Sequence, residues 1–286
     1  MKKSFIALLA VLIVVSMTFT LSSCELSDDE FVHTTETVQH TEGRTELKKS
    51  NEEVLAYFNT LVNSVKTKTP AVSYKQELKV DDKSLTVTKP GGQEDKNLKS
   101  FADSLPGLKS LILTDIQKKS GSVAYGNENN EVFFVKGESW SSALTTEDIS
   151  SAVMNEVGDK YYITITFDDI PEESRATLAK AFELRDKATL LNSPELAKIS
   201  EYLEVKDYAA MYKGSVISAT VDRLTDTLLS VAYSKTSDVK VSAKGLNTLE
   251  KHGDIEVGLI LKDTTSFTFV WEENRETSPL DTTTAQ

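Results

Sequence analysis

The chain has 286 residues, 44 of them acidic and 32 basic, and a formal net charge of −12. An acidic surface is repelled by phosphate backbones and by anionic lipid headgroups, so we expect neither a nucleic-acid interface nor a membrane-binding protein surface. Cys24 is the only cysteine, which excludes an intramolecular disulfide.

The first 24 residues have the layout of an export signal. Lys2 and Lys3 precede an apolar run over residues 5–19, which is shorter than the roughly 20 residues that a membrane span needs. A polar sequence, Leu21-Ser22-Ser23-Cys24, follows this run. The pattern predicts a signal peptide over residues 1–23.

The sequence Leu21-Ser22-Ser23-Cys24 resembles the lipobox of bacterial lipoproteins. The resemblance implies that signal peptidase II cleaves before Cys24, which then carries S-diacylglyceryl and N-acyl groups. It also implies a protein on the extracytoplasmic face of the cell membrane, held there by its acyl chains rather than by its own surface. An ordinary secretory signal with an unrelated cysteine is the alternative.

Composition divides the remaining chain into three parts. Residues 24–49 begin with an acidic segment, continue rich in Thr, Glu and His, and lack an apolar period, which is typical of a flexible tether. Residues 272–286 are polar and predict a disordered tail. Residues 50–271 are long enough for one large domain, and we expect a single α+β domain there.

The domain is predicted to begin with a helix. Ser50 and Glu53 form a Ser-x-x-Glu capping box, and apolar residues follow at helical spacing as far as Val65. Alternation with a period of two then predicts a strand over 72–80, and Leu85 and Val87 predict a strand that returns beside it after a turn at 81–83. A short helix is expected over 98–105.

The middle of the chain mixes short strands and helices. Strands are expected over 122–125 and 131–136, and a hairpin over 151–157 and 160–168 around Gly158-Asp159. Pro171 favours the start of a helix that includes Phe182 and Arg185, and residues 193–203 predict a second helix.

The last third predicts a strand meander. Five runs alternate or are apolar, over 215–221, 227–234, 238–243, 255–262 and 266–271, with polar breaks between them. Clean alternation indicates an antiparallel sheet with one face packed. We therefore expect an α+β fold in which helices cover one face of a long twisted antiparallel sheet, shaped as a half-barrel.

Catalytic and metal-binding patterns are weak. The predicted domain has one histidine, His252, in a polar turn, and Ser237 and Lys240 match a Ser-x-x-Lys pattern but point to opposite faces of a strand. Adjacent carboxylates such as Asp168-Asp169 and Glu172-Glu173 lack the spacing of a calcium loop. We expect no enzyme, no catalytic residue, no metal and no cofactor; an enzyme that uses carboxylates alone is the alternative.

The order of predicted elements resembles the half-barrel lipid-carrier lipoproteins of bacterial envelopes, over about residues 50–271. The resemblance implies a non-enzymatic domain that binds a lipid or other apolar or amphipathic ligand. Candidate lining residues are Tyr161, Ile163, Ile165 and Phe167, which share one face of a strand; the same residues would equally suit a filled core. The alternative function is a cell-surface adaptor that binds protein or glycan.

Overall fold

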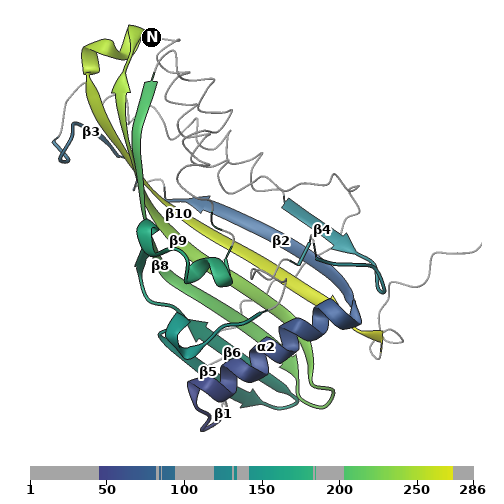
Figure 1. Ribbon diagram of the computed structural model, residues 1–286. Helices are drawn as coiled ribbons and strands as arrows, with labels where there is room; N and C mark the ends of the chain where they lie inside the picture. Colours follow the sequence, from purple (N-terminus) through teal and green to yellow (C-terminus); the bar gives the residue numbers. More distant parts are fainter. Residues whose placement is uncertain are drawn as a thin grey trace, which may run out of the picture.

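The computed structural model describes residues 45–81, 84, 86–93, 119–130, 132–133, 142–182, 184 and 203–272. In these residues one long helix, α2 (Asn51–Lys68), lies across one face of a long antiparallel sheet (Figure 1). The strands of this sheet are β1 (Thr45–Glu46), β2 (Ala71–Val80), β3 (Thr86–Thr88), β4 (Lys119–Val123), β5 (Ser151–Val157), β6 (Lys160–Thr166), β7 (Ile170–Pro171), β8 (Leu203–Asp222), β9 (Thr227–Gly245) and β10 (Asp254–Val270).

The strand order is β1-β5-β6-β8-β9-β10-β2-β4, with β3 paired to β10 and β7 paired to β8. The sheet is therefore open, with β1 and β4 at its two edges, and β8, β9 and β10 form its centre. These three strands span 20, 19 and 17 residues, far more than the usual five or six. The expected α+β fold, with a helix on one face of a long antiparallel sheet, is confirmed.

The helix α2 forms where the capping box predicts it. The Ser50 hydroxyl accepts from the Glu53 backbone N–H at 3.2 Å, and the Ser50 N–H donates to the Glu53 carboxylate at 2.8 Å. Thr69 ends the helix in the left-handed region, with φ 44°, and Pro70 prevents its continuation. The face that α2 buries carries Val54, Leu55, Phe58, Leu61, Val62 and Val65.

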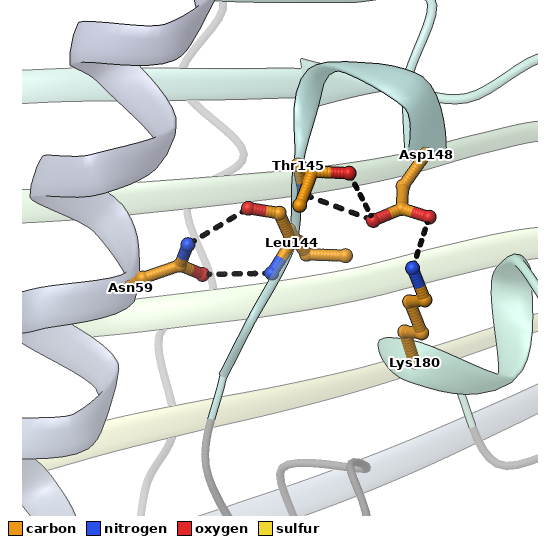
Figure 2. A network of polar contacts seen from close by, with 5 residues as sticks. All are labelled: Asn59, Leu144, Thr145, Asp148 and Lys180. Carbon is orange, nitrogen blue, oxygen red and sulfur yellow. Dashed lines mark hydrogen bonds and ion pairs between the residues drawn. The ribbon is translucent and has the colours of Figure 1, made fainter.

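Two asparagines one helical turn apart tie α2 to the segment before β5. Asn59 Nδ2 donates to the Leu144 carbonyl at 2.9 Å, and Asn59 Oδ1 accepts from the Leu144 N–H at 3.2 Å (Figure 2). Asn63 makes the same pair of bonds with Ser142, at 3.1 and 2.7 Å. Each asparagine side chain thus bonds both the backbone N–H and the backbone C=O of one residue, as a neighbouring strand would. Leu144 and Ser142 need these bonds because neither residue pairs with a strand.

The same segment is held at its other end by a carboxylate. Asp148 Oδ2 accepts from the backbone and hydroxyl of Thr145, and Asp148 Oδ1 lies 2.5 Å from Lys180 Nζ (Figure 2). Burial opposes ionisation of Asp148, but the bonds from Lys180 and Thr145 outweigh it, so its pKa is lowered. Residues 142–148 are consequently fixed between α2 and the short 3-10 helix η4 (Leu178–Lys180).

Asn59→Ala should lower the free energy of unfolding by about 2–3 kcal/mol, because the buried backbone groups of Leu144 lose their partners. Urea denaturation of the purified protein measures this change. Thr60→Ala, one residue away on the exposed side of α2, is the matched control and should cost less than about 0.5 kcal/mol. Equal losses in the two variants would contradict the role of Asn59 in holding the backbone of Leu144.

Several sequence predictions need correction. The five strands expected in the last third are three, because β9 and β10 each continue through a polar break, and β8 begins at Leu203 rather than at Ser215. The strand expected to return beside β2 does not do so: β3 runs on in the same direction and pairs with Glu256–Gly258 of β10, beyond the residues that β2 pairs with. The described domain also begins before Ser50, because β1 pairs with Asn155 and Glu156 of β5 inside the segment assigned to the tether.

The prediction of a helix that starts at Pro171 is also wrong. Pro171 ends the short strand β7, and two 3-10 turns follow, η3 (Glu172–Ser174) and η4. The hairpin of β5 and β6 is confirmed. The predicted helices over 98–105 and 193–203, the strand over 131–136, the signal peptide, Cys24 and the tail lie wholly or mainly outside the described residues.

Candidate functional site

The inner face of the sheet, on the side of α2, is defined by alternate residues of the three long strands. In β9 these are the odd-numbered residues from Val231 to Ala243, and in β10 the odd-numbered residues from Ile255 to Phe269. Val239, Val241, Leu259 and Leu261 are each no more than 3% exposed. The period of two that buries these side chains directs the intervening ones, such as Lys240 and Lys262, to solvent.

A polar patch interrupts this apolar face near the middle of the strands. Lys235 of β9 pairs directly with Asp263 of β10, and Lys235 Nζ lies 2.5 Å from Asp263 Oδ2. Both side chains are buried, at 5% and 6% exposure. Gln76 of β2 donates to the other Asp263 oxygen at 3.0 Å, so the carboxylate is bonded from both neighbouring strands.

A second polar group lies on the same face in the neighbouring strand β8, where Tyr212 is opposite the residue two positions after Lys235. Tyr212 of β8 donates its hydroxyl to Glu172 Oε2 at 2.5 Å, and Arg175 Nε is 3.5 Å from Glu172 Oε1. Burial is the main cause that raises the pKa of Tyr212, and the neighbouring Tyr208 and Glu172 raise it further. The phenol is therefore protonated at neutral pH and remains a hydrogen-bond donor.

Ser215 and Ser237 complete the polar patch. Ser237 pairs with Tyr212 of β8 and with Leu261 of β10, and lies two residues from Lys235 on the same face. The side chains of Ser215 and Ser237 are 0% and 1% exposed, and within the described part of the chain neither hydroxyl has a hydrogen-bond partner. A buried hydroxyl without a partner costs about 1–3 kcal/mol, so these two groups require an explanation.

A β-bulge brings Ser215 to this face. The pairing of β8 with β9 shifts between Lys213 and Val216, and Gly214 has a positive φ of 55°. Before the bulge the even residue Tyr212 faces inward, and after it the odd residues Ser215 and Ile217 do. Asp169 supports the turn by accepting from the Gly214 N–H at 3.1 Å. The bulge thus places a hydroxyl opposite Lys235.

Aromatic side chains border the patch. Phe182 packs edge-on against Phe167 and Tyr233, with ring centroids 5.4 and 6.0 Å apart. Lys235 Nζ lies 5.9 Å from the centre of the Phe182 ring. Burial raises the pKa of Tyr233 and keeps its phenol neutral. An apolar ring therefore lies beside the Lys235 ammonium, and such low-dielectric surroundings strengthen the electrostatic interactions of the patch.

The residues expected to line a ligand site lie elsewhere on the sheet. Ile163, Ile165 and Phe167 are at most 3% exposed and belong to the hydrophobic core. Tyr161 packs edge-on against Tyr57 of α2, with ring centroids 6.3 Å apart. The β6 end of the inner face is therefore closed by α2 (Figure 1).

Other candidates from the sequence do not assemble into a catalytic site. Ser237 is buried and Lys240 exposed, on opposite faces of β9 as predicted. His252 ends the 3-10 helix η5 (Asn247–His252), is half-buried, and accepts a hydrogen bond from Lys89 through its carbonyl. Among the described residues, no cluster of three or more His, Cys, Asp or Glu side chains could hold a metal ion.

Sequence reasoning missed the polar patch because it treated Lys235, Ser237 and Asp263 as breaks between strands. Glu172 was likewise taken for a residue at the start of a helix. One signal was present in the sequence: the odd-numbered parity of Val231, Tyr233, Val239 and Val241 continues unbroken through Lys235 and Ser237. An alternation that resumes in phase after polar residues indicates one strand rather than two.

Comparisons with protein-family models, with curated protein sequences and with solved structures found no match to this chain. In the described part of the chain, no helix combines the length and the apolar character needed to cross a membrane.

Lys235→Met should lower the free energy of unfolding by about 3–5 kcal/mol, because Asp263 would remain as a buried, uncompensated charge. The double variant Lys235→Met/Asp263→Leu should recover most of this loss, since it removes both charges together. Urea denaturation measures both. Lys213→Met, which breaks the more exposed Lys213–Asp238 pair on the outer face, is the matched control and should cost less than about 1 kcal/mol. A double variant whose loss equals the sum of the two single losses would contradict an energetic coupling between Lys235 and Asp263.

Proposed function

We propose that this protein is a membrane-anchored extracytoplasmic lipoprotein whose domain binds an apolar or amphipathic ligand, without catalysis, at the inner face of β8, β9 and β10. The observation that supports this best is the make-up of that face. Apolar residues extend along it on both sides of one enclosed polar patch, which matches a ligand with an apolar chain and a polar group.

The apolar part of the face is continuous next to the patch. Ala210 of β8 pairs with Val239 of β9, which pairs with Leu259 of β10, and Tyr208, Val241 and Val257 form the next row. All of these side chains are at most 6% exposed. Protein atoms cover these rows in this structure, so an alkyl chain would contact them where it displaces that cover, at about 25 cal/mol for each Å² of apolar surface kept from water.

The described surface gives less support to the adaptor alternative. A docking surface for protein partners commonly presents large apolar or aromatic side chains. Among the described residues the exposed large hydrophobic residue is Leu224, in the turn between β8 and β9. A single residue of this kind is ordinary and does not make a patch.

The anchor is proposed from Leu21-Ser22-Ser23-Cys24 alone. Acyl groups on Cys24 would keep the domain beside a reservoir of lipid, where a carrier or sensor of amphiphiles would meet its ligand. This arrangement also suits the acidic chain, which needs no attraction to the headgroups once acyl chains hold it.

The full chain, expressed in a bacterial host and purified in a mild detergent, should carry a non-covalent ligand. Native mass spectrometry would give a mass above the denatured mass, and the difference, which excludes the covalent anchor, identifies the ligand. Ala210→Phe should abolish this difference because the ring fills the inner face beside Val239. Ala209→Phe, on the exposed side of the same strand, is the matched control and should retain the ligand.

Both variants should melt cooperatively before they are compared. Equal native and denatured masses for the wild type, together with no uptake of a fluorescent fatty amphiphile, would favour the adaptor.

Cys24 should carry the anchor. Cells grown with an alkyne-labelled fatty acid should label the wild-type protein and not Cys24→Ala, and the mature N-terminal peptide should begin at Cys24 with its acyl mass. A wild-type peptide with a free Cys24 thiol would contradict the anchor and leave the ligand-binding proposal untouched.

A further inference from the structure

The polar patch is closed in this structure. Tyr212, Lys235, Ser237 and Asp263 are each at most 4% exposed. The long strands beneath them pair along almost their whole length, and α2 is capped and buries a full apolar face, so neither can open without the loss of many contacts. Access to the patch therefore depends on a covering element that is attached more loosely.

Residues 172–182, here called the cover segment, differ from the sheet and from α2 in their backbone bonds. They include the 3-10 turns η3 and η4, and hydrogen bonds in such turns are poorly aligned. Among the described residues, the backbone bonds of positions 173–182 all stay inside the cover segment, as from Arg175 N–H to the Glu172 carbonyl at 3.2 Å and from Phe182 N–H to the Leu178 carbonyl at 2.8 Å. These positions can therefore move away from the sheet without breaking a strand pair.

Side chains hold the cover segment in place. Lys180 Nζ lies 2.5 Å from Asp148 Oδ1, and the Lys180 side chain is 47% exposed (Figure 2). At the start of the segment, Glu172 accepts from the Tyr212 hydroxyl at 2.5 Å. A half-exposed ion pair contributes little to stability, whereas a buried hydrogen bond to a carboxylate contributes more. The segment thus has one weak and one stronger polar attachment.

Two apolar side chains seat the cover segment over the patch. Leu178 and Phe182 are 0% and 3% exposed. The Phe182 ring packs edge-on against Tyr233, with centroids 6.0 Å apart, and its centre lies 5.9 Å from Lys235 Nζ. Movement of the segment would therefore uncover Lys235, and the burial of Leu178 and Phe182 keeps the closed form dominant.

We propose that the cover segment opens as one unit over the polar patch while the sheet and α2 stay folded, with the Lys180–Asp148 and Glu172–Tyr212 contacts as its latches. Local opening of this kind occurs in elements with few bonds to the rest of a domain, long before the whole domain unfolds. The role of the segment as the entrance for an amphiphile rests on the proposed function, whereas the opening itself does not.

Hydrogen exchange of the ligand-free full-length protein, followed by mass spectrometry, tests the opening. Peptides within 172–182 should exchange at least about tenfold faster than peptides within β9. Below the unfolding transition, urea should accelerate exchange in β9 and hardly change it in the cover segment, because a small local opening exposes little surface.

Variants of the two latches test how the cover segment is held. Lys180→Ala should accelerate exchange in the segment about two- to fivefold. Tyr212→Phe should accelerate it at least about tenfold, because Glu172 loses a hydrogen bond to its carboxylate. Lys213→Ala is the matched control: it removes a similarly exposed ion pair, with Asp238 on the outer face, and should leave exchange in the cover segment unchanged.

Stopped-flow mixing with a fluorescent fatty amphiphile tests the role in ligand entry. Uptake by the wild type should reach a rate that no longer rises with probe concentration, because opening of the cover segment then limits binding. Lys180→Ala should raise this limiting rate about two- to fivefold, and Lys213→Ala should not change it.

The outcomes separate the opening from the proposed function. Exchange in 172–182 that matches β9 in rate and in urea dependence, or that accelerates equally in Lys180→Ala and Lys213→Ala, would overturn the opening. An unchanged limiting rate in Lys180→Ala, with its exchange accelerated, would show that the ligand enters elsewhere and would overturn the role as an entrance. Absence of uptake by the wild type, with the cover segment opening as expected, would overturn the proposed function and leave the opening standing.

Discussion

The ion pair between Lys235 and Asp263 determines how the central strands can align. A slip of one residue between β9 and β10 would send every inward side chain of one strand to solvent. A slip of two would keep the apolar face inward but would place Lys235 beside Leu261 or Thr265 and leave Asp263 without its cation. The pair therefore selects one register from those that burial alone allows. Its main effect is on specificity, because a buried ion pair adds little net stability.

The bulge in β8 depends on this register for its effect. Gly214 can adopt its positive φ without strain, and the extra residue changes the parity of the inward side chains from Tyr212 to Ser215. Without the bulge, Gly214 would lie opposite Lys235, and Ser215 would pair with Ser234 on the outer face. With it, a hydroxyl, an ammonium and a carboxylate lie in one row across three strands.

Local signals predicted the elements that depend on neighbouring residues. The capping box of Ser50 and Glu53 fixes the start of α2, and Gly158-Asp159 fixes the hairpin of β5 and β6, because both act within a few residues. The lengths of β8, β9 and β10 could not be read locally, since Lys235, Ser237 and Asp263 resemble loop residues until their partners across the sheet are known. Glu172 shows the same limit, because only the fold brings Tyr212 to it.

The pairing of β2 with β10 has a consequence for how the chain reaches this structure. Val72 lies beside Phe269, 197 positions away in the chain, and Gln76 bonds to Asp263, 187 positions away. Contacts of such high sequence separation form late and slowly, since a long loop must close before they gain any energy. In a chain that emerges from its N-terminus, β2 can pair with β4, but its other edge stays unpaired until β10 arrives. The last strand to be delivered thus completes both the sheet and the polar patch, and a chain that stops before residue 263 would keep an unpaired edge and an unneutralised Lys235.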